Sequence, residues 1–186
     1  GRVRDYRVLM LERMANVTIY RENPLSPDEI FEFSAEDQFD YSHVMLANGS
    51  SWRRDGLGRI HREPIPGLDK LKVFTPDDIM DGVLAKGRVV VFDDDHFYMG
   101  GVLAEKLRRE GHDVLLVTPA PDISTWTHKT LEQKKIQKQL MDLGVELATQ
   151  TNLTAAETGK VELSCIFTER KIEREFDCLL LVTERT

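Results

Sequence analysis

Residues 88–117 read RVVVFDDDHFYMGGVLAEKLRREGHDVLLV, and this stretch decides the fold class. Its first five residues form a β-branched run suited to a buried parallel strand. Residues 100–110 have helical spacing of apolar positions and are followed by a glycine that can end a helix. A second apolar run, residues 113–117, follows after a crossover of the length that a βαβ unit needs. We therefore predict an α/β fold with a Rossmann-like parallel sheet. The predicted helix has an apolar face that comprises Val102, Leu103 and Leu107.

The turn between the first strand and the helix carries Asp93, Asp94 and Asp95 where a dinucleotide-binding turn has glycines. A glycine-rich turn binds pyrophosphate because the missing side chains let it reach backbone N–H groups at the positive end of a helix. One carboxylate about 4 Å from a phosphate charge costs about 4 kcal/mol at an effective dielectric near 20. We therefore expect these acids to cap the helix and to exclude pyrophosphate. The alternative is a divalent-cation site that includes His96, although adjacent residues on a tight turn rarely converge on one ion.

The composition is that of an ordinary soluble globular protein. The 186 residues are 41% hydrophobic and 31% charged, and can hold one large or two small domains. A formal net charge of −7 argues against nucleic acid and an anionic membrane surface as partners. No transmembrane segment or signal peptide is visible in the sequence. Cys165 and Cys178 lie in apolar runs, so we expect buried, reduced thiols and a cytoplasmic location.

The chain contains an internal repeat. Residues 11–49 and residues 140–183 both show a helix, a short strand, an excursion, then Phe-Asp and a buried strand. The second copy has a complete βαβ start and the first copy lacks one, so we expect a fragment of a longer protein. The predicted divisions are residues 1–52 for the C-terminal part of a first, FAD- or ADP-binding half-domain, residues 53–87 for a connector, and residues 88–186 for a second Rossmann-like domain.

Several local signals refine this organisation. In the first copy we expect strands at residues 17–20 and 41–47, the second of which would place His43 in a core. Thr75 and Pro76 are typical of a helix N-cap and first helical position.

Other polar residues are weaker candidates for a functional role. His61, in the connector, is expected to brace the domain junction. His128 is either a proton carrier or, as we expect, a residue that packs or caps beside Trp126. A helix that follows has an apolar stripe and a solvated basic face. The stripe is predicted to comprise Ile136, Leu140, Met141 and Leu143, and the basic face Lys129, Lys134, Lys135 and Lys138.

The order of these features resembles the tandem dinucleotide-binding region of the NADH:flavin oxidoreductase family, in which an FMN-binding barrel precedes a glutathione-reductase-like pair of Rossmann domains. The family includes trimethylamine, dimethylamine and histamine dehydrogenases and 2,4-dienoyl-CoA reductase. Ala47-Asn48-Gly49 is similar to the Ala-Thr-Gly motif that closes the first domain, with Asn in place of Thr. Residues 52–56 and 64–67 are similar to the linker. Residues 100–117 are similar to the amine-dehydrogenase branch, whose second domain also has an acidic, glycine-poor turn.

The resemblance implies a parent oxidoreductase that holds FMN, FAD or ADP, and a 4Fe-4S cluster, and oxidises a small amine, as in N-demethylation, or reduces a dienoyl compound. It implies that Ala47, Asn48 and Gly49 are the local cofactor contacts; the alternative for these three residues is a plain strand end and turn. No catalytic residue or metal ligand is assigned to this chain. Its expected partner is the rest of the parent polypeptide, and a homo-oligomer is possible.

A nicotinamide-binding second domain would carry an acid or an arginine at the end of its second strand. This chain has residues 118–121, Thr-Pro-Ala-Pro, with only Asp122 nearby. Together with the acidic turn, this predicts a structural, catalytically silent domain that binds no nucleotide. The alternative function is a stand-alone nucleotide-sensing or protein-docking module without redox chemistry.

Overall fold

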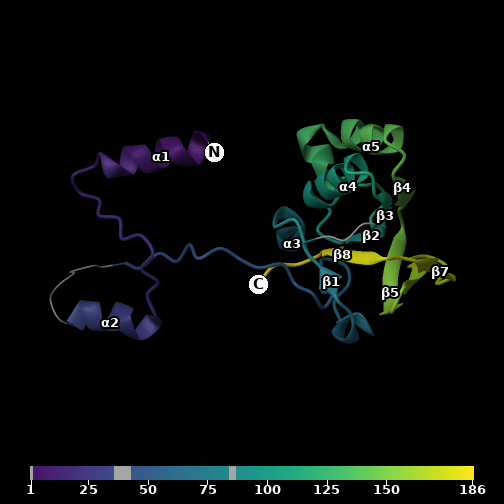
Figure 1. The fold of residues 1–186 in the computed structure, drawn as a ribbon, viewed down its shortest axis with the longest axis horizontal. Helices are drawn as coiled ribbons and strands as arrows, with labels where there is room; N and C mark the ends of the chain where they lie inside the picture. The colour runs from purple at the N-terminus through teal and green to yellow at the C-terminus, as the bar shows by residue number, and fades with distance from the viewer. Residues whose placement is uncertain (1, 36–42, 84–86) are drawn as a thin grey trace. The chain divides into compact units, whose positions relative to one another are not determined.

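The computed structural model describes residues 2–35, 43–83 and 87–186 (Figure 1). The chain divides into two compact units, Gly1–Asn48 and Gly49–Thr186. Within the described residues, no helix combines the length and the apolar character that a membrane span requires.

The described part of the first unit contains two helices, α1 (Arg2–Glu12) and α2 (Pro27–Ala35). A capping box begins α2: the Glu29 carboxylate accepts hydrogen bonds from the backbone N–H and the hydroxyl of Ser26, each at 2.7 Å. This local arrangement fixes where the helix begins.

The strand expected at residues 17–20 does not form in this structure, nor does the described part of the one at 41–47. Residues 41 and 42 lie outside the described residues. His43 is exposed rather than in a core, and the side chain of Met45 is 92% exposed. An extended segment becomes a strand only when a neighbour takes its N–H and C=O groups, and the described part of this unit holds no second strand.

The second unit is built on a five-stranded parallel sheet, in the order β1-β8-β2-β3-β4. Its strands are β1 (Val73–Phe74), β2 (Arg88–Asp93), β3 (Asp113–Val117), β4 (Glu146–Ala148) and β8 (Cys178–Val182). The predicted strands at 88–92 and 113–117 pair directly, with Val90 opposite Leu115. The predicted α/β class with a parallel sheet is confirmed.

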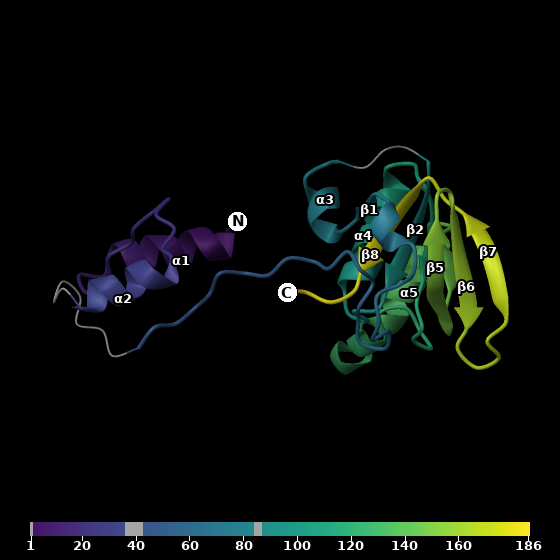
Figure 2. The same cartoon turned by 90° about the horizontal axis from the view of Figure 1, so that it is seen from below.

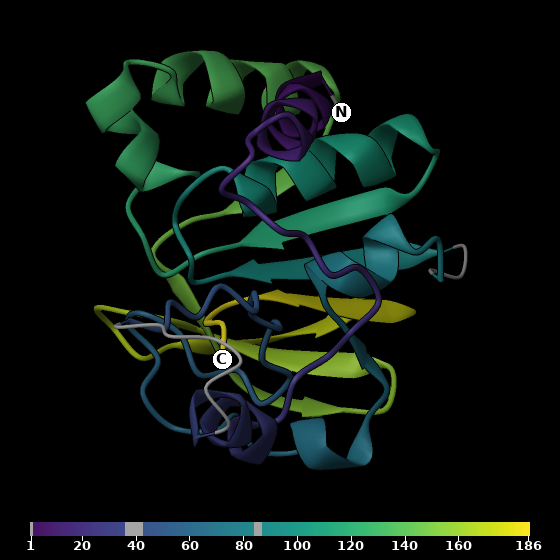
Figure 3. The same cartoon turned by 90° about the vertical axis from the view of Figure 1, so that its left-hand side faces the viewer.

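Helices cover one face of this sheet (Figure 3). They are α3 (Pro76–Met80), α4 (Met99–Arg109) and α5 (Gln133–Asp142), and a 3₁₀ segment, η2 (Thr125–Thr130), precedes α5. The helix α3 begins as predicted, with Thr75 as N-cap in a capping box with Asp78.

Two residues predicted on apolar faces point outward instead. The side chain of Val102 is 53% exposed, because α4 buries Leu103, Ala104 and Leu107 against the sheet. A step of one residue turns a helix by about 100°, which carries the side chain off the buried face. For the same reason Met141 is 61% exposed, next to the buried Leu140.

A three-stranded antiparallel sheet covers the other face of the parallel sheet (Figure 2). It consists of β5 (Thr151–Glu157), β6 (Lys160–Cys165) and β7 (Lys171–Glu175). Alternate residues of the central parallel strands therefore face two different cores. For example, Val89 and Val91 face the helices, whereas Val90 and Phe92 face Leu153 and the rest of the second core.

The two cysteines, Cys165 and Cys178, form no disulfide. Cys178 is buried at the start of β8, as predicted, but Cys165 is only half-buried at the end of β6.

The segment before β2 is part of the second unit. Residue Trp52 forms an antiparallel bridge with Arg185, and a 3₁₀ turn, η1 (Leu68–Lys70), packs against β5. The backbone N–H of Ala156 donates to the carbonyl of Pro66 at 3.0 Å. At Gly67, φ is +89° and an added Cβ would lie 1.9 Å from the carbonyl oxygen of Ala156.

Replacement of Gly67 by alanine should therefore destabilise the fold by about 2–4 kcal/mol, from backbone strain at positive φ and from steric overlap with β5. Gly159→Ala is the matched control, because Gly159 also has positive φ but has no atom within 4 Å of the added Cβ. It should cost about 1 kcal/mol. Urea unfolding measures both values, and equal losses would contradict the proposed overlap.

Candidate functional site

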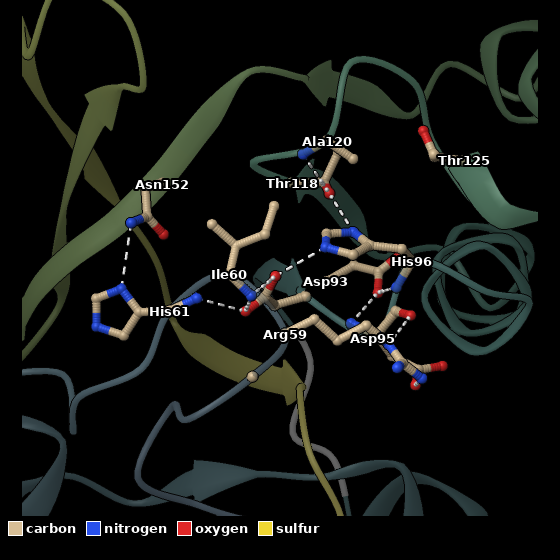
Figure 4. Close-up of polar contacts among 12 residues, drawn as sticks. Arg59, Ile60, His61, Asp93, Asp95, His96, Thr118, Ala120, Thr125 and Asn152 are labelled. Atoms are coloured by element: carbon tan, nitrogen blue, oxygen red, sulfur yellow. Dashed lines mark hydrogen bonds and ion pairs between the residues drawn. The ribbon is translucent and has the colours of Figure 1, made fainter.

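The acidic turn lies where the two central parallel strands end (Figure 4). β2 ends at Asp93, and the carbonyl of Val182, the last residue of β8, accepts hydrogen bonds from Asp94 N–H at 2.9 Å and Asp95 N–H at 3.1 Å. Open parallel α/β sheets bind their ligands at this carboxyl-terminal edge. The turn is therefore in the position of a ligand site.

Asp93 is fully buried and bonds to its own turn. Its Oδ1 accepts hydrogen bonds from the backbone N–H groups of Asp95 and His96, both at 3.1 Å. Its Oδ2 has no hydrogen-bond partner among the described residues. Burial raises the pKa of the Asp93 carboxyl to about 7, although the N–H groups of His96 and Asp95 favour the ionised form.

The prediction that the acidic residues 93–95 cap the following helix is wrong. α4 begins at Met99, and its N-cap residue, Tyr98, makes no side-chain capping bond. Asp93 instead closes the turn that precedes the helix, since the backbone N–H groups that donate to its carboxylate belong to residues two and three positions further on. In the same turn His96 is buried with φ of +63°, and its Nδ1 lies 3.3 Å from Thr118 Oγ1 at the end of β3.

Asp94 binds the connector. Its carboxylate accepts hydrogen bonds from the backbone N–H groups of Ile60, at 3.0 Å, and His61, at 2.9 Å. Its Oδ1 also lies 2.8 Å from His96 Nε2. The connector approaches so closely that a Cβ at Gly58 would lie 2.1 Å from Asp94 Oδ2. The buried charge is therefore compensated by backbone donors.

Asp95 is paired with two arginines. Its Oδ1 lies 3.2 Å from Nη2 of Arg59 and 3.7 Å from Nη2 of Arg185, and its carbonyl accepts a hydrogen bond from Arg59 Nε at 2.8 Å. Each guanidinium also stacks on a tryptophan at 4.4 Å from the ring centroid, Arg59 on Trp126 and Arg185 on Trp52.

The three carboxylates therefore point to three different neighbours. Asp93 faces its own turn, Asp94 the connector and Asp95 the two arginines. Among the described residues, no group of three or more His, Cys, Asp or Glu side chains could hold a metal ion. In place of an external anion, the turn contains carboxylates supplied by the chain itself.

The other residues singled out in the sequence lie elsewhere. Ala47, Asn48 and Gly49 are exposed. His61 contacts the small sheet through Nδ1, which lies 3.2 Å from Nδ2 of Asn152. His128 Nε2 is 2.9 Å from a carboxylate oxygen of the exposed Asp122.

The lysines predicted on one helical face are divided between two elements, because Lys129 lies in η2 and Lys134, Lys135 and Lys138 lie in α5. They make few specific contacts. Lys129 stacks over Trp126 at 4.7 Å, and Lys138 pairs with Asp142 one turn along the helix. Lys134 and Lys135 are exposed. Sequence reasoning missed the partners of the acidic turn, Arg59, Arg185 and Thr118, because no local pattern links them to residues 93–96.

Comparisons with known proteins identify the family to which this chain is similar. Residues 74–179 match the family model of the OYE-like second alpha/beta domain. A dimethylamine dehydrogenase from a Hyphomicrobium species is 32% identical over 174 residues, which cover 89% of this chain and 23% of that enzyme.

Two solved structures are similar to the whole chain. The structures of a 6-hydroxypseudooxynicotine amine oxidase from Pseudomonas geniculata and a histamine dehydrogenase from a Rhizobium species are both 40% identical to the chain, with TM-scores of 0.89. Both matches cover the whole chain, and 27% and 28% of the respective enzymes. A 2-naphthoyl-CoA reductase, 18% identical with a TM-score of 0.59, shares the fold alone.

The fold and the turn together define a mixed α/β domain in which the acidic turn is engaged by groups of the chain itself. The chain belongs to the family of OYE-like second alpha/beta domains. The expected similarity to dimethylamine and histamine dehydrogenases is confirmed. The chain spans about a quarter of the length of these relatives.

Asp93→Asn should stabilise the protein increasingly as pH rises. Since the pKa of Asp93 is about 7 when folded and about 4 when unfolded, the folded state keeps a proton that the unfolded state has lost between these values. Wild-type stability from this group is complete below about pH 4 and declines toward pH 7. Urea unfolding at several pH values should show the difference between variant and wild type growing to at most about 4 kcal/mol and then levelling. A difference that is independent of pH would contradict a raised pKa.

Asp94→Ala should destabilise the protein by about 3 kcal/mol, because it leaves the N–H groups of Ile60 and His61 without their acceptor. Hydrogen exchange should show these two amides losing protection. Asp122→Ala is the control: its exposed ion pair with His128 should contribute less than about 1 kcal/mol. Unchanged exchange at residues 60 and 61 in Asp94→Ala would refute the anchoring role.

Proposed function

We propose that this chain is the second α/β domain of a flavin-dependent amine dehydrogenase and that it acts there as a structural, nucleotide-type domain that binds neither NADH nor NADPH. The names of the relatives support the amine-dehydrogenase part of the proposal. One observation carries the second part: the turn that would hold the pyrophosphate is already engaged by the chain itself.

The backbone donors of the turn are in use. The N–H groups of Asp94 and Asp95 bind the carbonyl of Val182, and those of Asp95 and His96 bind Asp93 Oδ1. A pyrophosphate at this edge needs such donors. It would also lie beside the carboxylates of the turn. One unscreened carboxylate at about 4 Å costs about 4 kcal/mol at an effective dielectric near 20, and the arginines beside Asp95 reduce this cost at that residue. Both effects, the engaged donors and the charge repulsion, weaken the binding of a pyrophosphate.

The topology supports a Rossmann-type origin for the domain. The order β4-β3-β2-β8, with the reversal between β2 and β8, follows the 3-2-1-4 order of doubly wound nucleotide-binding sheets. We assign residues 88–186 to a glutathione-reductase-like second domain, residues 53–87 to a connector and residues 1–52 to the end of a first, FAD- or ADP-binding domain.

Of the proposed cofactors, FAD or ADP is compatible with residues of this chain and the 4Fe-4S cluster is not. An open backbone at Ala47, Asn48 and Gly49 can approach FAD or ADP: all three are exposed, and no atom lies within 4 Å of the Cβ position of Gly49. A 4Fe-4S cluster does not fit here, because such a cluster takes four cysteine thiolates and the chain has two. We place the cluster ligands, FMN and the amine-oxidising residues in the rest of the parent polypeptide.

Isothermal titration calorimetry of the full chain with NADH and with NADPH tests the proposal. We expect no binding below millimolar concentrations, because the donors and the charge both oppose a pyrophosphate. Circular dichroism confirms that the titrated protein is folded. A micromolar constant for either nucleotide would overturn the non-binding role.

Asp95→Asn separates the two causes. The substitution removes one negative charge but leaves the N–H groups of residues 94–96 bound to Val182 and Asp93. We expect this variant to remain silent toward both nucleotides. Micromolar binding by the variant alone would show that charge, rather than donor engagement, excludes the nucleotide.

A further inference from the structure

A cleft of about 380 Å³ lies beside the acidic turn. It is lined at the carboxyl-terminal ends of β2 and β8 by residues of the connector, the turn and the segment after β3. Its lining includes Arg59, Arg62, Arg185, Asp95, Trp126 and Thr183. All of these residues belong to the second unit, Gly49–Thr186.

The three arginines are held in place with donors to spare. Arg59 and Arg185 stack on tryptophan rings and approach Asp95, and Nη1 of Arg62 donates to the carbonyl of Gly58 at 3.2 Å. A guanidinium has five N–H donors, and none of these arginines uses more than two of them in the hydrogen bonds of the described residues. The cleft therefore presents oriented cationic donors without a matching number of acceptors.

The charge balance of the cleft is positive in an acidic protein. Three guanidinium groups face two carboxylates, Asp95 and Glu184, whereas the whole chain carries −7. The buried Asp94 lies nearby, but its charge is taken up by two backbone N–H groups and by His96. The cleft lining therefore carries one net positive charge, which favours an anion over a cation.

Thr183 adds a neutral donor. It is 1% exposed, and its Oγ1 has no hydrogen-bond partner among the described residues. Buried hydroxyl groups are normally hydrogen-bonded, and that of Thr183, a residue that lines the cleft, is an exception among the described residues.

We infer that this cleft binds a small oxyanion, a phosphate or a carboxylate, through Arg59, Arg62 and Arg185. The ligand is small because the cleft has a volume of about 380 Å³. It lies among the arginines rather than on the turn amides, which are already bonded. Planar guanidinium groups bind phosphate and carboxylate through paired N–H donors. This inference goes beyond the proposed function, since it needs neither a nucleotide nor the flavin.

Tryptophan fluorescence of the full chain provides the test. The two tryptophans, Trp52 and Trp126, each contact a cleft arginine, so an anion that moves these side chains alters the emission. Inorganic phosphate and succinate are titrated separately, with ionic strength held constant by sodium chloride. A saturable change with phosphate, or with succinate, supports the inference and identifies the class of anion. No saturation with either would overturn it, whatever the nucleotide titrations show.

Variants locate the binding. Arg62→Ala should weaken binding at least about tenfold, the value of one charge-assisted hydrogen bond. Thr183→Val, which keeps the side-chain shape, should weaken it severalfold. Arg109→Ala is the control, because Arg109 lies on α4 and pairs with Glu105. If Arg62→Ala fails to fold in thermal unfolding, Arg62→Gln replaces it. Equal affinity in a folded Arg62 variant and in wild type would overturn the assignment.

Discussion

Two backbone N–H groups of the connector, those of Ile60 and His61, converge on the buried carboxylate of Asp94. A buried charge is stable only when donors surround it, so the turn and the connector stabilise each other. This contact brings Arg59 next to Asp95 and thereby forms one wall of the cationic cleft. The position of the connector and the shape of the cleft both depend on it.

Much of the second unit was predictable from local sequence. The β-branched runs and the glycine at residue 111 predicted β2, α4 and β3, and the Thr75-Pro76 pair predicted the start of α3, because spacing and capping act over a few residues. The small antiparallel sheet was not predicted. Its strands alternate polar and apolar residues only partly, and a register shift between Leu153 and Ala155 interrupts the alternation in β5.

The destinations of the acidic side chains could not be predicted. The sequence predicts that residues 93–95 lie in a turn. The partners of Asp94 and Asp95, however, come from segments distant along the chain, such as residues 59–61 and Arg185. Likewise, the apolar runs at residues 17–20 and 43–47 look like strands, but strand formation depends on a neighbour that a local pattern does not specify.

Because each carboxylate of the turn has its own partner, no single substitution converts the turn into a glycine-rich one without breaking another contact. Restoring a glycine at position 94 would strip the acceptor from the connector while Asp93 still held the amides of residues 95 and 96. Nucleotide binding at this turn would therefore require several replacements, and the one at position 94 would by itself cost the connector its anchor. The donors at this sheet edge are thus committed to groups of the chain itself, and a change at one carboxylate is felt by segments distant along the sequence.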